Sequence, residues 1–288
     1  MRNPFKKSIE NESPAWNISV YTILTIVALV SLFPILNVVS KSFSTVGKEV
    51  VFLPQGITWF NWGYVLAESA FYRAFGVSVL VTLFGTLLSV GFMFMAAYPL
   101  SKKDLPFRKG FMMFFMVVML FSGGIVPNFV VMTMLGLTNT PFALVIPSLV
   151  QVYNMILLKN NLEGVPAEIE ESARIDGAGN MVILVQILLP ICIPSIASVA
   201  LFTAVTYWNN YFNALLYISP MAEELYPLAM YILNRIKTAA DVDDMTVLNQ
   251  KTYIDAAMIV ISMLPIVCAY PFVLKFFVGG LTVGSVKG

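Results

Sequence analysis

Long apolar stretches alternate with shorter polar ones along the chain. A helix of about 20 apolar residues crosses the roughly 30 Å hydrocarbon core of a bilayer. The pattern therefore predicts an all-α integral membrane protein with six transmembrane helices, at about 18–39, 75–100, 111–134, 142–158, 190–218 and 254–278. The membrane domain would span 17–278, between an N-terminal segment at 1–16 and a tail at 279–288.

The third apolar stretch is interrupted by Ser122-Gly123-Gly124 and by Pro127. Irregular backbone is tolerated at membrane depth only where it is buried in protein or lines a water-filled cavity. The interruption therefore predicts a packed helix bundle or a transport pathway.

One polar segment, 162–186, separates the fourth apolar stretch from the fifth and holds five of the sixteen acidic residues. Pro166 suits the first turn of a helix, and three glutamates follow it near the positive end of the helix dipole. A short helix is predicted to begin near Pro166. On this helix Glu170 and Arg174 are four residues apart and are expected to pair.

The dipeptide Asp176-Gly177 predicts a turn after this helix, since Gly accepts a positive φ at a helix end. Asp176 is expected to cap a second helix that runs into Ile187-Leu188-Leu189-Pro190.

The residues Glu171-Ser172-Ala173, Gly177 and Ile187-x-Leu189-Pro190 resemble the EAA motif of permease subunits in ATP-binding-cassette (ABC) importers. All the spacings match, and Ser172 stands where the motif has its first Ala. The sequence VPAEIEESARIDGAG is most similar to that of permeases in the carbohydrate-uptake branch, which are of the maltose type and its oligosaccharide-type relatives.

The resemblance implies that 162–186 is a cytoplasmic coupling loop, whose helix docks on a separate ABC ATPase. Its coupling residues would be Glu170, Glu171, Ser172, Ala173, Asp176, Gly177, Ile187, Leu189 and Pro190. The resemblance also implies a second permease subunit, two ATPase subunits, a sugar or oligosaccharide substrate and an extracytoplasmic solute-binding protein that delivers it. It favours a heterodimeric pore, and it implies no cofactor.

Composition narrows the functional classes. A chain that is 58% hydrophobic and 11% charged, with a mean hydropathy of +0.82, has too little polar surface to coat a soluble globule. The absence of histidine excludes Ser-His-Asp chemistry and His-ligated metal sites, and a net charge of +1 gives no reason to expect nucleic-acid binding. No Walker A pattern occurs, so ATP hydrolysis is expected in a partner and the chain itself is expected to be non-catalytic.

The sequence fits two other functions less well. A self-contained secondary transporter, driven by an ion gradient, usually buries an ionisable residue at mid-membrane. The first five apolar stretches have no clearly central one, which counts against that function. A membrane enzyme would need catalytic side chains gathered at one site. The carboxylates of this chain lie in loops, which counts against an enzyme.

Positive charge predicts the orientation. Eleven of the seventeen Lys and Arg residues fall on the side of the termini, 101–110 and the coupling loop, and six fall on the other side. The positive-inside rule therefore predicts a multi-pass protein of the cytoplasmic membrane with both termini in the cytoplasm.

The fifth stretch carries the candidate substrate path. Thr203, Thr206, Asn210, Asn213 and Tyr217 recur at helical spacing, and would share one helical face. One interpretation is hydrogen bonding between helices, at about 0.6 kcal/mol per contact. The other is a sugar path, because amides can pair with hydroxyls and aromatic rings can stack on sugars. WNNYFNALL also resembles the asparagine-bearing span that contacts sugar in maltose-type permeases. The candidate path comprises Thr206, Trp208, Asn209, Asn210, Tyr211, Asn213 and Tyr217.

Overall fold

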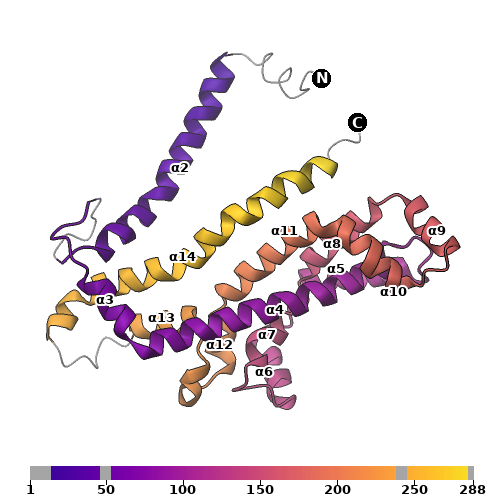
Figure 1. Cartoon of the computed structure of the whole chain (residues 1–288). Coiled ribbons are helices and arrows are strands. Elements are labelled where there is room, and N and C mark those ends of the chain that lie inside the picture. The colour runs from indigo at the N-terminus through magenta and orange to yellow at the C-terminus, as the bar shows by residue number, and fades with distance from the viewer. Residues whose placement is uncertain (1–13, 46–52, 238–244, 285–288) are drawn as a thin grey trace. The chain divides into compact units, whose positions relative to one another are not determined.

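The computed structural model describes residues 14–45, 53–237 and 245–284, and all regular structure within these ranges is helical (Figure 1). The predicted N-terminal segment 1–16 and tail 279–288 lie partly outside the described residues. The chain forms two compact units, one of residues 1–67 with 240–261 and the other of residues 68–239 with 262–288.

The first unit contains α2 (Pro14–Ser42) and α3 (Phe60–Ala67). Asn61 on α3 is fully buried and its amide donates to the carbonyl oxygens of Ser42 and Ser44, at 3.1 and 2.9 Å. These bonds satisfy backbone acceptors at the end of α2, where a helix leaves its last carbonyls without partners.

The helices of the second unit follow α4 (Ser69–Ser101) in chain order (Figure 1). They are α5 (Arg108–Leu120), α6 (Ile125–Met134), α7 (Phe142–Val145), η1 (Ile146–Ser148), α8 (Val152–Glu163), α9 (Ala167–Ile175), α10 (Asn180–Val182), η2 (Ile183–Leu188), α11 (Leu189–Trp208), α12 (Phe212–Tyr217), η3 (Pro220–Leu225) and α13 (Leu228–Lys237). The last helix, α14 (Met245–Gly284), begins in the first unit and ends in the second.

Four helical stretches are long and apolar enough to cross a membrane, namely Trp16–Ser42, Ser69–Ser101, Asn180–Trp208 and Gln250–Pro271. Two further candidates are bent pairs. α5 and α6 meet at 111°, and the helical segment Phe142–Ser148 meets α8 at 54°. Residues 14–45, 53–237 and 245–284 thus contain four to six candidate spans, and the predicted stretches at 111–134 and 142–158 are bent rather than straight.

The break between α5 and α6 has a local cause. Gly124 adopts φ +90°, a conformation that side-chain-bearing residues rarely reach, and its N–H bonds to the Ser122 hydroxyl at 3.2 Å. The sequence therefore indicated this break correctly. The break at 149–151 carries no glycine and follows Pro147 in η1.

Two apolar cores lie at opposite ends of α4 and α11. One core includes Met93, Leu158, Ile183 and Leu188, and the other includes Val81, Leu144, Tyr207, Tyr217 and Met230. Figure 1 shows α9 and α10 beyond one end of α4, α8 and α11, with α6, α7 and α12 away from that end. The end with α9 is called here the coupling end.

Tyr207 joins α4, α7 and α11. It is 1% exposed, and its hydroxyl shares a 2.8 Å hydrogen bond with Ser89 and donates to the Val145 carbonyl at 3.1 Å. A Cβ on Gly85 would lie 2.9 Å from the Tyr207 ring, so only glycine allows this approach of α4 to α11.

Polar contacts show which segments lie at the same end of the second unit. Arg108 pairs with Glu163 at the coupling end. At the other end, Asn139 donates to the Tyr217 carbonyl at 2.9 Å, and its side-chain oxygen accepts from the Ser219 N–H at 2.6 Å. The bent α5–α6 pair therefore connects the two ends of the second unit.

Candidate functional site: a coupling loop and a polar seam

The predicted short helix exists as α9. It begins directly after Pro166, with Glu168 and Glu170 in its first turn. Gly177 ends it with φ +86°, while the Gly177 N–H donates to the Arg174 carbonyl at 3.0 Å and the Ala178 N–H to the Ala173 carbonyl at 2.9 Å. This is a left-handed glycine cap, which satisfies the last carbonyls of the helix and reverses the chain.

One face of α9 packs on the bundle and the other is free. Ala173 is 7% exposed and belongs to the core at the coupling end, whereas Glu171, Ser172 and Asp176 are exposed. The small Ala173 side chain allows the helix to lie close to that core. The exposed acidic face is available to a partner.

Two apolar side chains of the same loop are exposed, and sequence reasoning missed them. Ile175 is 86% exposed and Met181 is 63% exposed, on either side of the Gly177 turn. Exposed apolar side chains on a polar segment are typical of an interaction surface. The signal for Ile175 was present in the sequence, since it lies between Arg174 and Asp176, whereas Met181 begins the apolar run 181–185.

The expected pair between Glu170 and Arg174 does not form. Glu170 instead pairs with Lys102, which directly follows α4, and Arg174 donates to the Asn180 side-chain oxygen at 3.0 Å. Helical spacing predicted the local pair. The tertiary fold instead brings Lys102, 68 residues away in the sequence, next to Glu170.

The second half of the motif lies in a continuous helical stretch, Asn180–Trp208, which starts ten residues before Pro190. Gly179, rather than Asp176, precedes its first turn, and Asp176 ends α9. The stretch includes a π-helical segment at Ile183–Leu188. Ile187 packs against the core at the coupling end, while Leu189 and Pro190 are exposed.

The second candidate site begins where α11 ends, at Trp208. The chain leaves the helix at Asn209 and resumes as α12 at Phe212. The expectation that one helical face runs from 203 to 217 is therefore wrong. The Asn210 side chain stabilises the break, because its oxygen accepts from the Asn213 N–H at 3.0 Å.

Polar side chains from two helix breaks meet here. We call this group the polar seam, and it consists of Ser148, Gln151, Asn154, Thr203, Asn210 and Asn213. The amides of Asn210 and Asn213 lie 3.5 and 3.4 Å from the Ser148 hydroxyl. The amide of Asn154 lies 2.7 Å from the Gln151 side-chain oxygen and 3.3 Å from the Thr203 hydroxyl.

The seam is partly unsatisfied. The Gln151 amide nitrogen is buried and has no hydrogen-bond partner. The contacts of Asn210 and Asn213 to Ser148 are long for hydrogen bonds. A group of amides and hydroxyls with spare capacity can exchange its internal contacts for sugar hydroxyls. Ser148 and Asn154 were missed from the sequence because they lie 49 to 65 residues from their partners on α11 and α12, and Gln151 was missed because it joins the group through Asn154.

The remaining residues of the candidate substrate path lie outside the polar seam. Thr206 and Asn209 are exposed, and both donate back to backbone carbonyls of α11, while Tyr211 is 44% exposed. The Trp208 indole donates to the Ser262 carbonyl at 3.1 Å, and the Tyr217 ring stacks on Phe129. Trp208 and Tyr217 thus serve packing in this structure.

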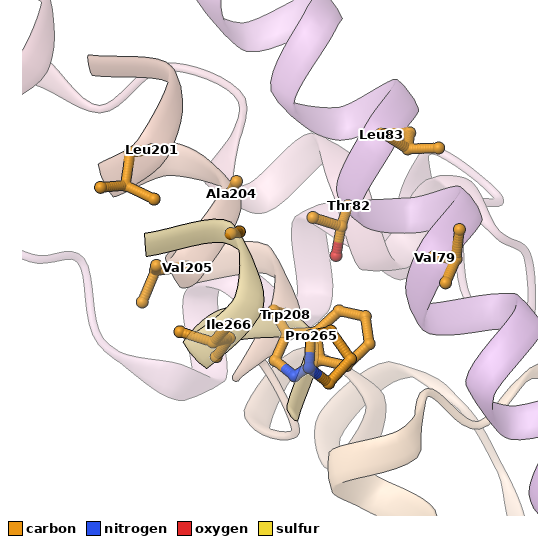
Figure 2. A pocket seen from close by; sticks show the side chains of 10 residues that line it. Val79, Thr82, Leu83, Leu201, Ala204, Val205, Trp208, Pro265 and Ile266 are labelled. Atoms are coloured by element: carbon orange, nitrogen blue, oxygen red, sulfur yellow. The ribbon is translucent and has the colours of Figure 1, made fainter. Parts of the chain in front are cut away.

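A cavity of about 200 Å³ lies between α4, α11 and the part of α14 within the second unit (Figure 2). Its lining is almost entirely apolar, with Leu83, Leu201 and Ile266 prominent and Thr82 its main polar residue. This chemistry does not suit a sugar. Within the described ranges, no three His, Cys, Asp or Glu side chains gather to hold a metal ion.

Known proteins are similar to this chain over most of its length. Residues 93–278 match the family described as "Binding-protein-dependent transport system inner membrane component". The chain is 35% identical to the polygalacturonan/rhamnogalacturonan transport system permease protein YtcP of Bacillus subtilis, covering 93% of this chain and 97% of that protein. It is 30% identical to the arabinooligosaccharides transport system permease protein AraQ of Halalkalibacterium halodurans, covering 91% and 93%.

A solved structure is similar along nearly the whole chain. It is a crystal structure of a bacterial ABC transporter involved in the import of the acidic polysaccharide alginate. One of its chains superposes with a TM-score of 0.83 at 32% identity, covering 92% of this chain and 99% of that one.

Proposed function

Because the chain belongs to the family of binding-protein-dependent transport system inner membrane components, the permease subunits of ABC importers, we propose that it moves an oligosaccharide across the cytoplasmic membrane. Permeases for sugar chains recur among its relatives, which are named for polygalacturonan, arabinooligosaccharides and maltodextrin. The observation that carries the proposal is the match of relatives and fold over more than nine tenths of the chain, together with the family match over residues 93–278.

The coupling loop receives the ATPase. The exposed face of α9, with Glu171, Ser172 and Asp176, and the neighbouring exposed Ile175 and Met181 offer a mixed acidic and apolar docking surface. Because α9 packs on the core through Ala173, a push on the helix is transmitted to α4 and α11 as rigid-body movement. The ATP is hydrolysed in the partner.

The polar seam contributes to the sugar path. Its amides and hydroxyls are uncharged, and those of Ser148, Asn210 and Asn213 point toward one another across two helix breaks. An exposed aromatic ring at Tyr211 lies on the same break and is suited to stacking on a sugar.

Six spans with both termini in the cytoplasm fit the contacts best. The bent α5–α6 pair and the bent segment 142–163 each run between the coupling end and the opposite end, which supports counting each as one span. Four basic residues at 101–110 favour a cytoplasmic coupling end. The complete importer then contains a second permease subunit, in a heterodimer, two ATPase subunits and an extracytoplasmic solute-binding protein.

Co-purification from membranes tests the proposal. The tagged full-length chain is expected to bring down an ATPase subunit and a second permease. The reconstituted complex should hydrolyse ATP faster when a sugar-loaded binding protein is added. A chain purified without an ATPase, with uptake abolished by collapsing the ion gradient but not by ATP depletion, would contradict the proposal.

A further inference from the structure

Charged side chains just after α4 hold both sides of the connection between α8 and α9. Lys102, the first residue after α4, pairs with Glu170 in α9, and its ammonium lies 4.5 Å from the centre of the Tyr98 ring. Arg108, the first residue of α5, pairs with Glu163, the last residue of α8. The loop from α8 to α9 is therefore attached to the end of α4 on each side.

The contacts around Glu163 form a network, with which the ion pair between Lys102 and Glu170 shares no partner. The Arg108 side chain also donates from Nε to the Leu100 carbonyl at 2.9 Å, and Lys159 contacts Glu163 at 2.8 Å. The Lys159 and Glu170 side chains are only 11% and 13% exposed. An isolated surface ion pair contributes little to stability, but several charges with shared partners fix a geometry.

We propose that Lys102 and Arg108 are positioning residues that clamp the coupling helix to α4, so that movement of α9 turns α4 with it. The proposal rests on the proposed function, in which α9 receives the ATPase. It assigns these two basic residues a role in energy coupling beyond membrane orientation.

The clamp gives α4 a direct part in transmission. This helix has 33 residues, which is about 50 Å at 1.5 Å per residue. Near the middle of α4, Gly85 and Ser89 contact Tyr207 of α11, three residues before Asn210 of the polar seam. A displacement at Glu170 would therefore reach the seam through α4 and Tyr207.

Lys103 is a matched control for Lys102. Lys103 lies in the same basic segment and is exposed, and it takes part in no ion pair among the described residues. If basic charge at 101–110 served only to orient the protein in the membrane, Lys102 and Lys103 would be equivalent. The clamp predicts that they differ.

The test compares Lys102→Glu, Glu170→Lys, the double variant and Lys103→Glu in the full reconstituted importer. The measured quantity is sugar transported per ATP hydrolysed. Each single variant of the pair is expected to lower this ratio at least about twofold, since residues along coupling networks change coupling by roughly two- to thirtyfold. The double variant should recover it, and Lys103→Glu should leave it unchanged.

An unchanged ratio in Lys102→Glu, or no recovery in the double variant, overturns the clamp. If the Lys102 variants do not reach the membrane, the exchange of Arg108 and Glu163 through Arg108→Glu and Glu163→Arg gives the same comparison. Failure of the proposed function is distinct, because the unaltered chain would then neither bind an ATPase nor support ATP-dependent uptake.

Discussion

Gly177 sets the direction in which α9 points, because its positive φ of +86° reverses the chain at the end of that helix. A Cβ at this position would meet no atom within 4 Å, so a larger side chain has space. The cost of substitution is conformational only. A left-handed conformation costs a side-chain-bearing residue about 1–2 kcal/mol.

Gly177→Val is therefore expected to relax the cap and change the aim of the coupling helix, so that sugar-stimulated ATP hydrolysis falls while the protein still inserts in the membrane. Gly179→Val is the matched control. Gly179 also has open space but adopts φ −74° and ψ 164°, which valine accepts readily. Normal stimulation in Gly177→Val would mean that the turn does not aim a docking helix.

The structural roles of some residues could be predicted from the sequence, and those of others could not. Pro166, Asp176 and Gly177 shape the backbone locally, so their types and spacing predicted a helix from Pro166 and a turn at Gly177. Glu170 could not be assigned in this way. Its partner Lys102 is selected by tertiary packing of α9 against the end of α4, which overrides the helical spacing to Arg174.

At the level of helices, length and hydropathy predicted where the apolar segments lie, but only some of their breaks. The break before α6 is encoded by Ser122 and two glycines. The break after Trp208 contains only Asn209, Asn210 and Tyr211, none of which excludes a helix. It forms because Asn210 bonds to the backbone of Asn213 and both amides reach Ser148 on a distant segment.

Replacing Asn210 or Asn213 by Leu separates the two interpretations of the polar seam. If the seam contacts sugar, each variant should assemble normally and keep basal ATP hydrolysis. Uptake should fall about fivefold or more, because a net hydrogen bond contributes about 1 kcal/mol. Radiolabelled sugar uptake and subunit stoichiometry are the measurements.

The control for these variants is Thr133→Val on α6, where an exposed hydroxyl bonds only to the Phe129 carbonyl and lies outside the seam. It should leave both measurements unchanged. If Asn210→Leu and Asn213→Leu instead reduce assembly while affinity for the sugar is kept, the seam serves to tie helices together.

At the scale of the whole molecule, the two ends of the second unit carry different chemistry. The coupling end has the ion pairs of Lys102, Arg108 and Lys159. The opposite end has neutral contacts around Asn139, one ion pair between Arg235 and Glu68 at 3.5 Å, and the exposed Met221 in η3. Positive charge retained on one side is the usual mark of the cytoplasmic face. The count of Lys and Arg predicts this orientation from the sequence, whereas the contacts that join each end required the structure.

Cysteine labelling tests this orientation directly. In a background with Cys192→Ala and Cys268→Ala, a single cysteine is introduced by Lys103→Cys or by Met221→Cys. Both positions are exposed, and Met221 is 96% exposed, so a difference in labelling reports the side of the membrane rather than burial. An impermeant thiol reagent should label Met221→Cys in intact cells. Lys103→Cys should be labelled only after permeabilisation, and its labelling in intact cells would invert the topology.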